Sequence, residues 1–343
     1  MSTTVTSLQC AISGVTETDH CTNTEILGSA LLGASEDSQT LSPAFWPRQT
    51  LRTELLGGQA TLEERWFSTS DCRSGEQDGL RWRRNDELLY GVIELDESDF
   101  ATADIPPLQA AAAAAYARIF ALLDAQQLPQ LWRTWNYMAA INRDSHGLER
   151  YRQFNIGRQD AFRAARRALE VQLPAACALG FAGGPLSIAF LAGRRPIIAI
   201  ENPRQMSAFA YPRRYGPRSP SFSRAALAHP TGAEILFISG TASIVDHRSI
   251  HDGDVVAQTR ETLCNIGAVV DAANTRALSR PFRLDELHYR IYLRHAADLP
   301  QVTAVLDEVL GPLAIPMSRL YLRADVCRTE LLVEIEAQAI HPR

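Results

Sequence analysis

Two seven-residue segments, LSIAFLA at 186–192 and LLVEIEA at 331–337, decide the fold of this chain. Both patterns predict strands, and aligning position 189 with position 334 sets the segments 145 positions apart. The helix-like segments IFALLDA (119–125) and IGAVVDA (266–272) repeat at almost the same interval, 147 positions. Chance similarity of two amphipathic patterns is the alternative, but a shared order of elements favours duplication of one α/β unit.

Each copy is predicted as strand, helix, strand, helix and a closing hairpin. Pro106 and Pro107 precede a run whose apolar residues recur at intervals of three and four, which indicates one face of a helix. In the second copy Asp254 is placed to cap the helix that follows it. We predict the closing hairpins from 175–181 with 186–193, and from 318–326 with 331–340.

The duplication also sets the predicted domain boundaries. Residues 1–50 are rich in Ser and Thr with weak periodicity, so we expect an N-terminal extension that is a loosely packed leader or an edge element. The first unit then spans 51–200, and the second unit spans 226–343. Between them, 201–225 forms a basic connecting segment rich in Tyr, Arg and Pro.

Composition bounds the class of protein. The chain has 343 residues, which suits two domains, and its net charge of −5 disfavours a general nucleic-acid binder. No apolar run reaches the length of a bilayer span, and the start, MSTTVTSLQC, lacks the regions of a secretory signal. The six cysteines are scattered, as reduced thiols are. We therefore predict a cytoplasmic protein that binds neither nucleic acid nor membrane.

Glu334 is the charged residue of the second copy where the first copy has Ala189. Strand alternation places Glu334 and Glu336 on one face, and Ile335 on the opposite face. If Ile335 faces the core, Glu334 lines either solvent or a cleft. A cleft would raise its pKa by desolvation and suit it to general acid–base catalysis, whereas a solvated strand face is the ordinary alternative.

Cys327 precedes Glu334 by seven positions, and hairpin pairing would bring the two side chains close. A small buried hydrophobe is the ordinary role of a lone cysteine, and a functional thiol is the alternative.

The segment YPRRYGPRSPSFSR (211–224) lies between the two copies, so it can line the groove where they meet. Arginine forks suit carboxylates, and the prolines restrict the backbone, which lowers the entropy lost on binding. An exposed basic linker is the alternative. The candidate binding residues of this segment are Tyr211, Tyr215, Arg218 and Arg224.

Three further residues are candidates for binding a carboxylate. Tyr151 and Arg158 fall on the predicted helix at about 148–169, and Arg290 falls on a strand, although each alone is also an ordinary surface residue. His247 and His251 lie in an Asp-rich loop without a zinc signature, so we predict no metal site. The sequence also lacks the GxSxG, P-loop and GxGxxG motifs of serine hydrolases and nucleotide-binding enzymes.

Several long motifs together resemble the chorismatase family, over about residue 80 to the end of the chain. They are RTWNYMAAIN, GLERYRQFNIGR, IENP, YPRRYGPRSPSFSRA, ISGTASIVDHRSIHDGD and LLVEIEA. The fold of that family is similar to the Rid/YjgF (chorismate mutase-like) fold. The resemblance therefore implies an α/β (α+β) protein of two tandem Rid-like units, each a mixed sheet packed against two helices.

The resemblance also implies a substrate and a reaction. The substrate would be chorismate, whose two carboxylates explain several arginines in one pocket of an acidic protein. The family's catalytic glutamate matches Glu334. Hydrolytic members have a small residue at the position of Cys327, and members that form 3-hydroxybenzoate have cysteine. This chain thus resembles the branch that releases pyruvate and forms 3-hydroxybenzoate, or both 3- and 4-hydroxybenzoate, without a cofactor.

Two other functions stay open from the sequence. Rid deaminases have an arginine fifteen positions before the matching glutamate, and Arg319 stands there in this chain, which would suit a 2-iminoacid deaminase. A non-catalytic protein that binds an acidic metabolite is the third alternative. We expect a monomer or a small homo-oligomer.

Overall fold

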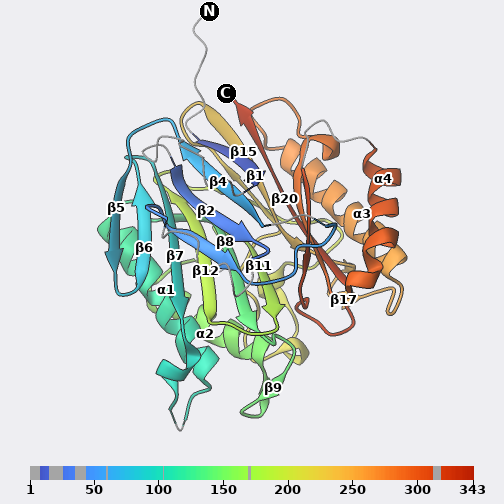
Figure 1. Ribbon diagram of the computed structural model, residues 1–343, viewed down its shortest axis with the longest axis horizontal. Helices are drawn as coiled ribbons and strands as arrows, with labels where there is room; N and C mark the ends of the chain where they lie inside the picture. The colour runs from blue at the N-terminus through green and yellow to red at the C-terminus, as the bar shows by residue number, and fades with distance from the viewer. Residues whose placement is uncertain are drawn as a thin grey trace, which may run out of the picture.

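The computed structural model describes residues 8–14, 26–34, 44–58, 61–102, 104–168, 171–311 and 318–343. Within these ranges the chain forms three larger sheets and four α-helices. Helices α1 and α2 cover one side of the molecule, α3 and α4 cover the opposite side, and the sheets lie between them (Figure 1).

The two copies have the same topology, which confirms the duplicated Rid-like unit. The sheet of the first copy has the order β11-β8-β12-β7-β6-β5, and that of the second has the order β19-β18-β20-β15-β14-β13. In both sheets the first pair is parallel and the other pairs are antiparallel. The elements of the first copy are β5 (Arg73–Gln77), β6 (Leu80–Arg84), β7 (Leu88–Leu95), α1 (Pro107–Ala125), β8 (Gln130–Ala139), α2 (Arg150–Ala164), β11 (Ala175–Phe181) and β12 (Leu186–Gly193). Those of the second are β13 (Ile198–Ile200), β14 (Ala225–Ala228), β15 (Ala233–Thr241), α3 (Val255–Asn274), β18 (His288–Leu293), α4 (Leu299–Leu310), β19 (Arg319–Arg323) and β20 (Val333–Pro342).

The predicted closing hairpins are wrong. Strands β11 and β12 follow each other in the chain, but β8 lies between them in the sheet, and β18 separates β19 from β20 in the same way. The parallel neighbours are instead β8 with β11 and β18 with β19, and helices α2 and α4 make the two crossover connections. A glycine-containing linker between two apolar runs does not distinguish these arrangements.

The prediction of a loosely packed leader is wrong for the described part of residues 1–50. Strand β2 (Ile26–Leu32) is buried along its whole length and lies inside a third sheet. That sheet has the order β1-β4-β2-β3, with β1 (Leu8–Gly14), β3 (Arg48–Leu51) and β4 (Leu62–Ser68). Strands β1 and β3 are edge strands, as the alternative prediction had it.

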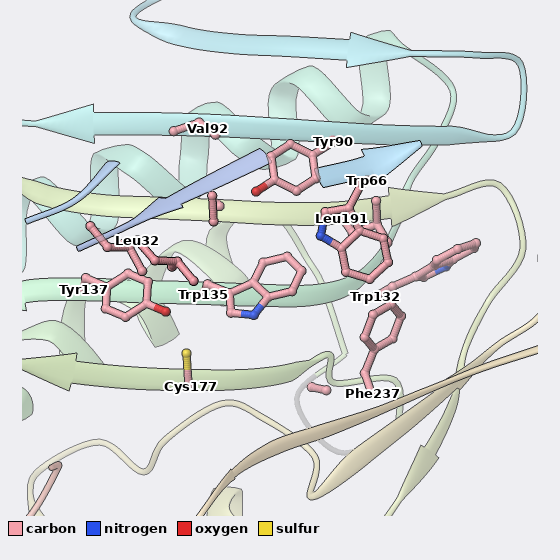
Figure 2. Packing of buried hydrophobic residues seen from close by; sticks show 14 of the residues in the cluster. Leu32, Trp66, Tyr90, Val92, Trp132, Trp135, Tyr137, Cys177, Leu191 and Phe237 are labelled. Carbon is pink, nitrogen blue, oxygen red and sulfur yellow. The ribbon is translucent and has the colours of Figure 1, made fainter. Parts of the chain in front are cut away.

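The three sheets share one apolar core. Trp66 of the third sheet lies 6.1 Å from Trp135 of the first copy and 5.9 Å from Phe237 of the second, measured between ring centroids. Figure 2 shows these rings meeting in the space between the strands. Each copy also has one apolar cluster of its own, which lies between its sheet and its two helices.

The helices follow the signals in the sequence. Pro107 occupies the first turn of α1, and the Asp254 carboxylate accepts a hydrogen bond from Ala257 N at 2.9 Å at the start of α3. By length and composition alone, α1 is the one helix among the described residues that could cross a membrane. Half of its most apolar stretch is buried, and it packs on α2 through Tyr116 and Phe162, as the core helix of a globular domain does.

Candidate active site

A cavity of about 300 Å³ lies at the seam between the two copies. An inner recess adjoins it and shares five of its lining residues, Glu334 and Gly240 among them. The walls come from the start of α2, the 211–224 segment, β15, the loop before β20 and β20 itself. The lining residues used below are Tyr151, Arg152, Tyr211, Arg214, Tyr215, Arg224, Gly240, Cys327, Arg328 and Glu334, with Arg158 and Cys177 in the recess.

Glu334 lies at the floor of this cavity. Strand alternation turns Val333 and Ile335 toward the apolar cluster under α3 and α4, so Glu334 faces the first copy and is only 3% exposed. Within the described part of the chain, its carboxyl group has neither a hydrogen bond nor an ion pair. Burial, and then the nearby Glu336 carboxylate, raise its pKa to about 8, against an opposing effect of Arg133. Glu334 is therefore a carboxylic acid at neutral pH, able to donate a proton.

Gly240 makes room for the Glu334 carboxyl group. It lies on β15 beside the irregularity in the β15–β20 pairing between Ile238 and Thr241. A Cβ atom at position 240 would lie 2.0 Å from Glu334 Oε1, so any side chain there would displace the carboxyl group. The sequence carried this signal, because an isolated glycine inside a strand marks a close approach of other atoms.

Arg224 and Arg328 present cationic groups along the cavity wall. Arg224 is almost fully buried, donates from Nη2 to Tyr211 Oη at 2.9 Å and to Met206 O, and leaves Nε without a partner. Arg328 stacks 4.1 Å from the Tyr215 ring centroid and leaves Nη2 without a partner. Both side chains are thus held in place, and each has an N–H group that can still donate a hydrogen bond to a ligand.

Arg158 supplies a buried cation at the inner recess. It is 2% exposed, and its guanidinium group lies over the rings of Tyr116 and Phe162 at 5.0 and 5.7 Å. Its nearest hydrogen-bond acceptor is Thr134 Oγ1 at 3.5 Å, its Nε has no partner, and no carboxylate among the described residues pairs with it. Since burying an unpaired charge costs several kcal/mol or more, such a site favours an anionic ligand.

Sequence comparison places this arrangement among known proteins. The chain is 38% identical over 297 residues to a chorismatase of Streptomyces rapamycinicus, an alignment that covers 84% of this chain and 85% of that protein. This chain belongs to the chorismatase family. A 3-hydroxybenzoate synthase of Streptomyces hygroscopicus is 37% identical to it, with 80% of each chain covered.

The structure agrees with that assignment along the whole chorismatase fold. A crystal structure of a chorismatase superposes with a TM-score of 0.84 at 32% identity, covering 97% of this chain and 98% of the other. The family profile described as "Chorismatase FkbO/Hyg5-like, N-terminal" matches residues 64–192, and the profile described as "Endoribonuclease L-PSP" matches residues 220–341. The first profile thus matches mainly the first copy, and the second profile matches the second copy.

Most of the side chains singled out in this chorismatase sequence meet at the cavity. The structure brings together Tyr151, Arg158, Tyr211, Tyr215, Arg224, Cys327 and Glu334. The sequence reasoning missed Arg328 and Gly240. Arg328 directly follows Cys327, but nothing in its local pattern distinguishes it from a surface cation.

Two of the predicted substrate contacts are corrected by the structure. Arg218 does not line the cavity, because its side chain turns outward, 3.4 Å from Asp160. Arg290 is buried deeper between the sheets, where it pairs with Glu64 at 2.6 Å and with Glu336 at 3.4 Å. On β18 it is Tyr292, not Arg290, that stands opposite Glu334.

Cys327 reaches the cavity from a loop rather than from a hairpin strand. The neighbouring Asp325 forms a bridge with Gly180 of β11, which holds this loop against the first copy. Burial, and then the charge of Glu334, raise the pKa of the Cys327 thiol to about 12. Cys327 is thus a neutral thiol beside Glu334, unsuited to attack as a thiolate.

Arg319 and the histidine-rich loop do not contribute side chains to the cavity. Arg319 pairs with Asp307 and donates to Gly311 O, so it lies against α4. The arginine that suggested a deaminase is therefore turned away from Glu334. His247 packs against Arg214 and Tyr215 instead, and the described residues hold no group of three or more His, Cys, Asp or Glu placed to bind a metal.

Proposed function

We propose that this enzyme cleaves chorismate to pyruvate and 3-hydroxybenzoate, with 4-hydroxybenzoate as a second ring product. The observation that carries the proposal is one buried carboxylic acid, Glu334, which has no partner among the described residues and lies at the floor of a cavity rich in arginine. The names of the relatives, a chorismatase and a 3-hydroxybenzoate synthase, support the same substrate.

The charge of the cavity matches the charge of the substrate. Chorismate carries one carboxylate on the ring and another on the enolpyruvyl ether. We assign one carboxylate to Arg158 in the recess, because this buried cation pairs with no carboxylate in the part of the chain that the structure describes. The other carboxylate binds at Arg224 and Arg328, beside the hydroxyl groups of Tyr211 and Tyr215. Binding both ends fixes the ether between them and holds the substrate in a reactive position.

Glu334 then acts on the ether. Its neutral carboxyl group supplies the proton that the enolpyruvyl group takes up as its bond to the ring breaks and it leaves as pyruvate. The Glu334 carboxylate then takes back the proton that the ring loses as it becomes aromatic, so the acid is restored. The atoms of chorismate equal those of pyruvate plus hydroxybenzoate, so this route needs neither added water nor an oxidant. We expect no cofactor for it. Formation of the aromatic ring is strongly downhill, so the protein mainly selects which C–O bond breaks.

Cys327 helps to choose the aromatising route. Its neutral thiol lies at the cavity wall with Glu334, and we assign it a contact with the ring of the substrate. A compact sulfur at this position occupies space that a water molecule would need to attack the substrate. Loss of the side chain would then admit water and favour a dihydrodiol.

The test is incubation with chorismate, followed by chromatography of pyruvate and the ring products. We expect pyruvate and hydroxybenzoate in equal amounts. Turnover of 2-iminoacids without turnover of chorismate would instead indicate the deaminase. Binding of chorismate without turnover of either compound would indicate a non-catalytic protein.

We place the reaction in the cytoplasm, and we expect a monomer or a small homo-oligomer. One chain supplies all three sheets around the central core, and both walls of the cavity, so a second copy is not needed to complete the site. Light scattering after size-exclusion chromatography tests the oligomeric state, and fractionation of expressing cells tests the location.

A further inference from the structure

Glu336 lies two positions after Glu334, on the same face of β20, and its surroundings are the opposite of those of Glu334. It is 4% exposed, and its carboxylate forms an ion pair with Arg133 of the first copy. It also accepts hydrogen bonds from Tyr292 Oη at 3.0 Å and from Arg290 Nη1 at 3.4 Å. Two cations and a hydroxyl group thus surround this one carboxylate and pair with it.

The two arginines that hold Glu336 occupy equivalent positions in the two copies. Arg133 stands opposite Leu191 on β12, and Arg290 stands opposite Glu336 on β20, the position that matches Leu191. Arg290 also pairs with Glu64 of the third sheet at 2.6 Å, and Tyr137 Oη lies 2.8 Å from Tyr292 Oη. The cluster is therefore tied to all three sheets and is fixed in place.

We propose that Glu336 is a positioning residue for the reaction: its carboxylate pairs with Arg133 and Arg290, and so keeps Glu334 from forming an ion pair with Arg133. This inference rests on the proposed role of Glu334. Without the charge of Glu336, Arg133 would be free to stabilise Glu334 as a carboxylate. Glu334 would then be held as an ion pair and would lose the proton that it donates.

Among the charged and titratable groups around Glu334, Glu336 and Arg133 are the two whose charges act on its pKa. Burial raises the pKa of Glu334, the charge of Glu336 raises it further, and Arg133 lowers it. Burial also raises the pKa of the neighbouring Cys177, Cys327 and Tyr151, so these groups are neutral. The other charged groups of the cavity and its recess are Glu149, Arg152, Arg158, Arg214, Arg224, Arg328 and Glu330.

Two substitutions break the same ion pair but have opposite effects on Glu334. Glu336→Gln removes the negative charge, so the pH at which Glu334 loses its proton should fall by about one pH unit or more. Arg133→Gln removes the positive charge, so this pH should rise. A purely structural role would weaken folding in both variants without moving the titration in opposite directions.

The titration is read in two ways. The carboxylic acid band of Glu334 in the infrared spectrum, assigned by its loss in Glu334→Gln, is followed against pH without substrate. The fall of kcat at alkaline pH is followed with chorismate, and the midpoint should move as the infrared band does. Arg133→Lys, which keeps the charge, is the matched control and should leave the infrared midpoint in place.

Shifts of both variants in the same direction, or no shift in either, would overturn the inference. If one variant does not fold, the direction of the shift in the other, compared with Arg133→Lys, decides. If neither neutral variant folds, the test is the double variant Arg133→Lys with Glu336→Asp, which keeps both charges. The inference requires that Glu334 in this variant still loses its proton at alkaline pH, as followed by the infrared band. Opposite infrared shifts in a protein that does not turn over chorismate would uphold this inference and reject the proposed function.

Discussion

Strands β12 and β20 hold equivalent central places in the two copies, yet their inner faces differ completely. On β12 that face carries Ala189 and Leu191, and Ala189 packs in the core opposite Trp135. On β20 it carries Glu334 and Glu336, with Tyr292 opposite Glu334. The third sheet closes over the first copy through Trp66, whereas the seam between the copies leaves room for a cavity. One copy thus packs an apolar strand face into the core, and the other buries two acids on the matching face.

The first way to break this comparison is to remove the acid from β20. Glu334→Gln should lower kcat by about a thousandfold or more, since the amide keeps the shape but has no proton to donate. Pyruvate release measures the effect. Glu308→Gln, an exposed substitution on α4, is the matched control and should leave the rate unchanged. A rate within tenfold of the wild type would remove Glu334 from the chemistry.

The second way is to give β12 an acid. Ala189→Glu places a carboxyl group at the position of Glu334, but into a core without a partner for it. We expect a loss of about 3–5 kcal/mol in the free energy of unfolding, from the uncompensated burial of a charge or from its neutralisation and overpacking. Urea unfolding measures it, and Ala189→Val should cost clearly less. If Ala189→Glu were as stable as the wild type, the surroundings of position 189 would accept a buried acid as those of position 334 do.

A third test narrows the space beside Glu334. Gly240→Ala adds a Cβ atom that would lie 2.0 Å from Glu334 Oε1, so the carboxyl group must move. A displacement of about 1 Å can cost up to a hundredfold in rate, and we expect a fall in kcat/KM of about tenfold to a hundredfold. Steady-state kinetics measure it, and Gly183→Ala is the matched control, because a Cβ atom at position 183, between β11 and β12, would meet no other atom within 4 Å. Unchanged kinetics would show that the contact relaxes without cost.

Stability against pH sharpens the comparison further. Burial raises the pKa of Glu334 to about 8 from an unfolded value near 4.5, so the folded state binds the proton more tightly. The stabilisation by this proton is complete below pH 4.5 and is lost as the pH rises toward 8. Glu334→Gln does not titrate, so its free energy of unfolding, measured with urea, should gain on that of the wild type between pH 6 and pH 9, by a few kcal/mol at most. An equal difference at both pH values would contradict the raised pKa.

The smallest effect is expected at Cys327. Cys327→Ala should leave the total rate of pyruvate release within about tenfold of the wild type, while the ring product moves toward the dihydrodiol. Chromatography of the ring products measures the ratio, and Cys264→Ala on the exposed side of α3 is the control. An unchanged ratio would remove Cys327 from the choice of product.

The sequence predicts the copies and the acid because both rest on local periodicity. The two β strands share a pattern, and alternation places Glu334 on the face opposite Ile335. The sequence does not predict the third sheet. Its strands, such as β2, are short and pair with segments far away in the chain, and no helix pattern lies between these strands to mark them as a unit. The sequence also does not separate Arg290 from a substrate contact. Alternation predicts which face of the strand a side chain is on, but not how deeply the side chain is buried. Arg290 lies on the same face as Tyr292, which stands opposite Glu334, but two residues earlier in β18.

The place of β20 has a consequence for how activity arises during synthesis. This strand is the last of the described strands to leave the ribosome, yet it lies in the middle of its sheet, between β15 and β18. The sheet of the second copy is therefore completed only when β20 pairs with both of its neighbours, and the same pairing places Glu334. A nascent chain that stops short of residue 333 would have neither a finished sheet nor a proton donor, so incomplete copies would not consume the metabolite.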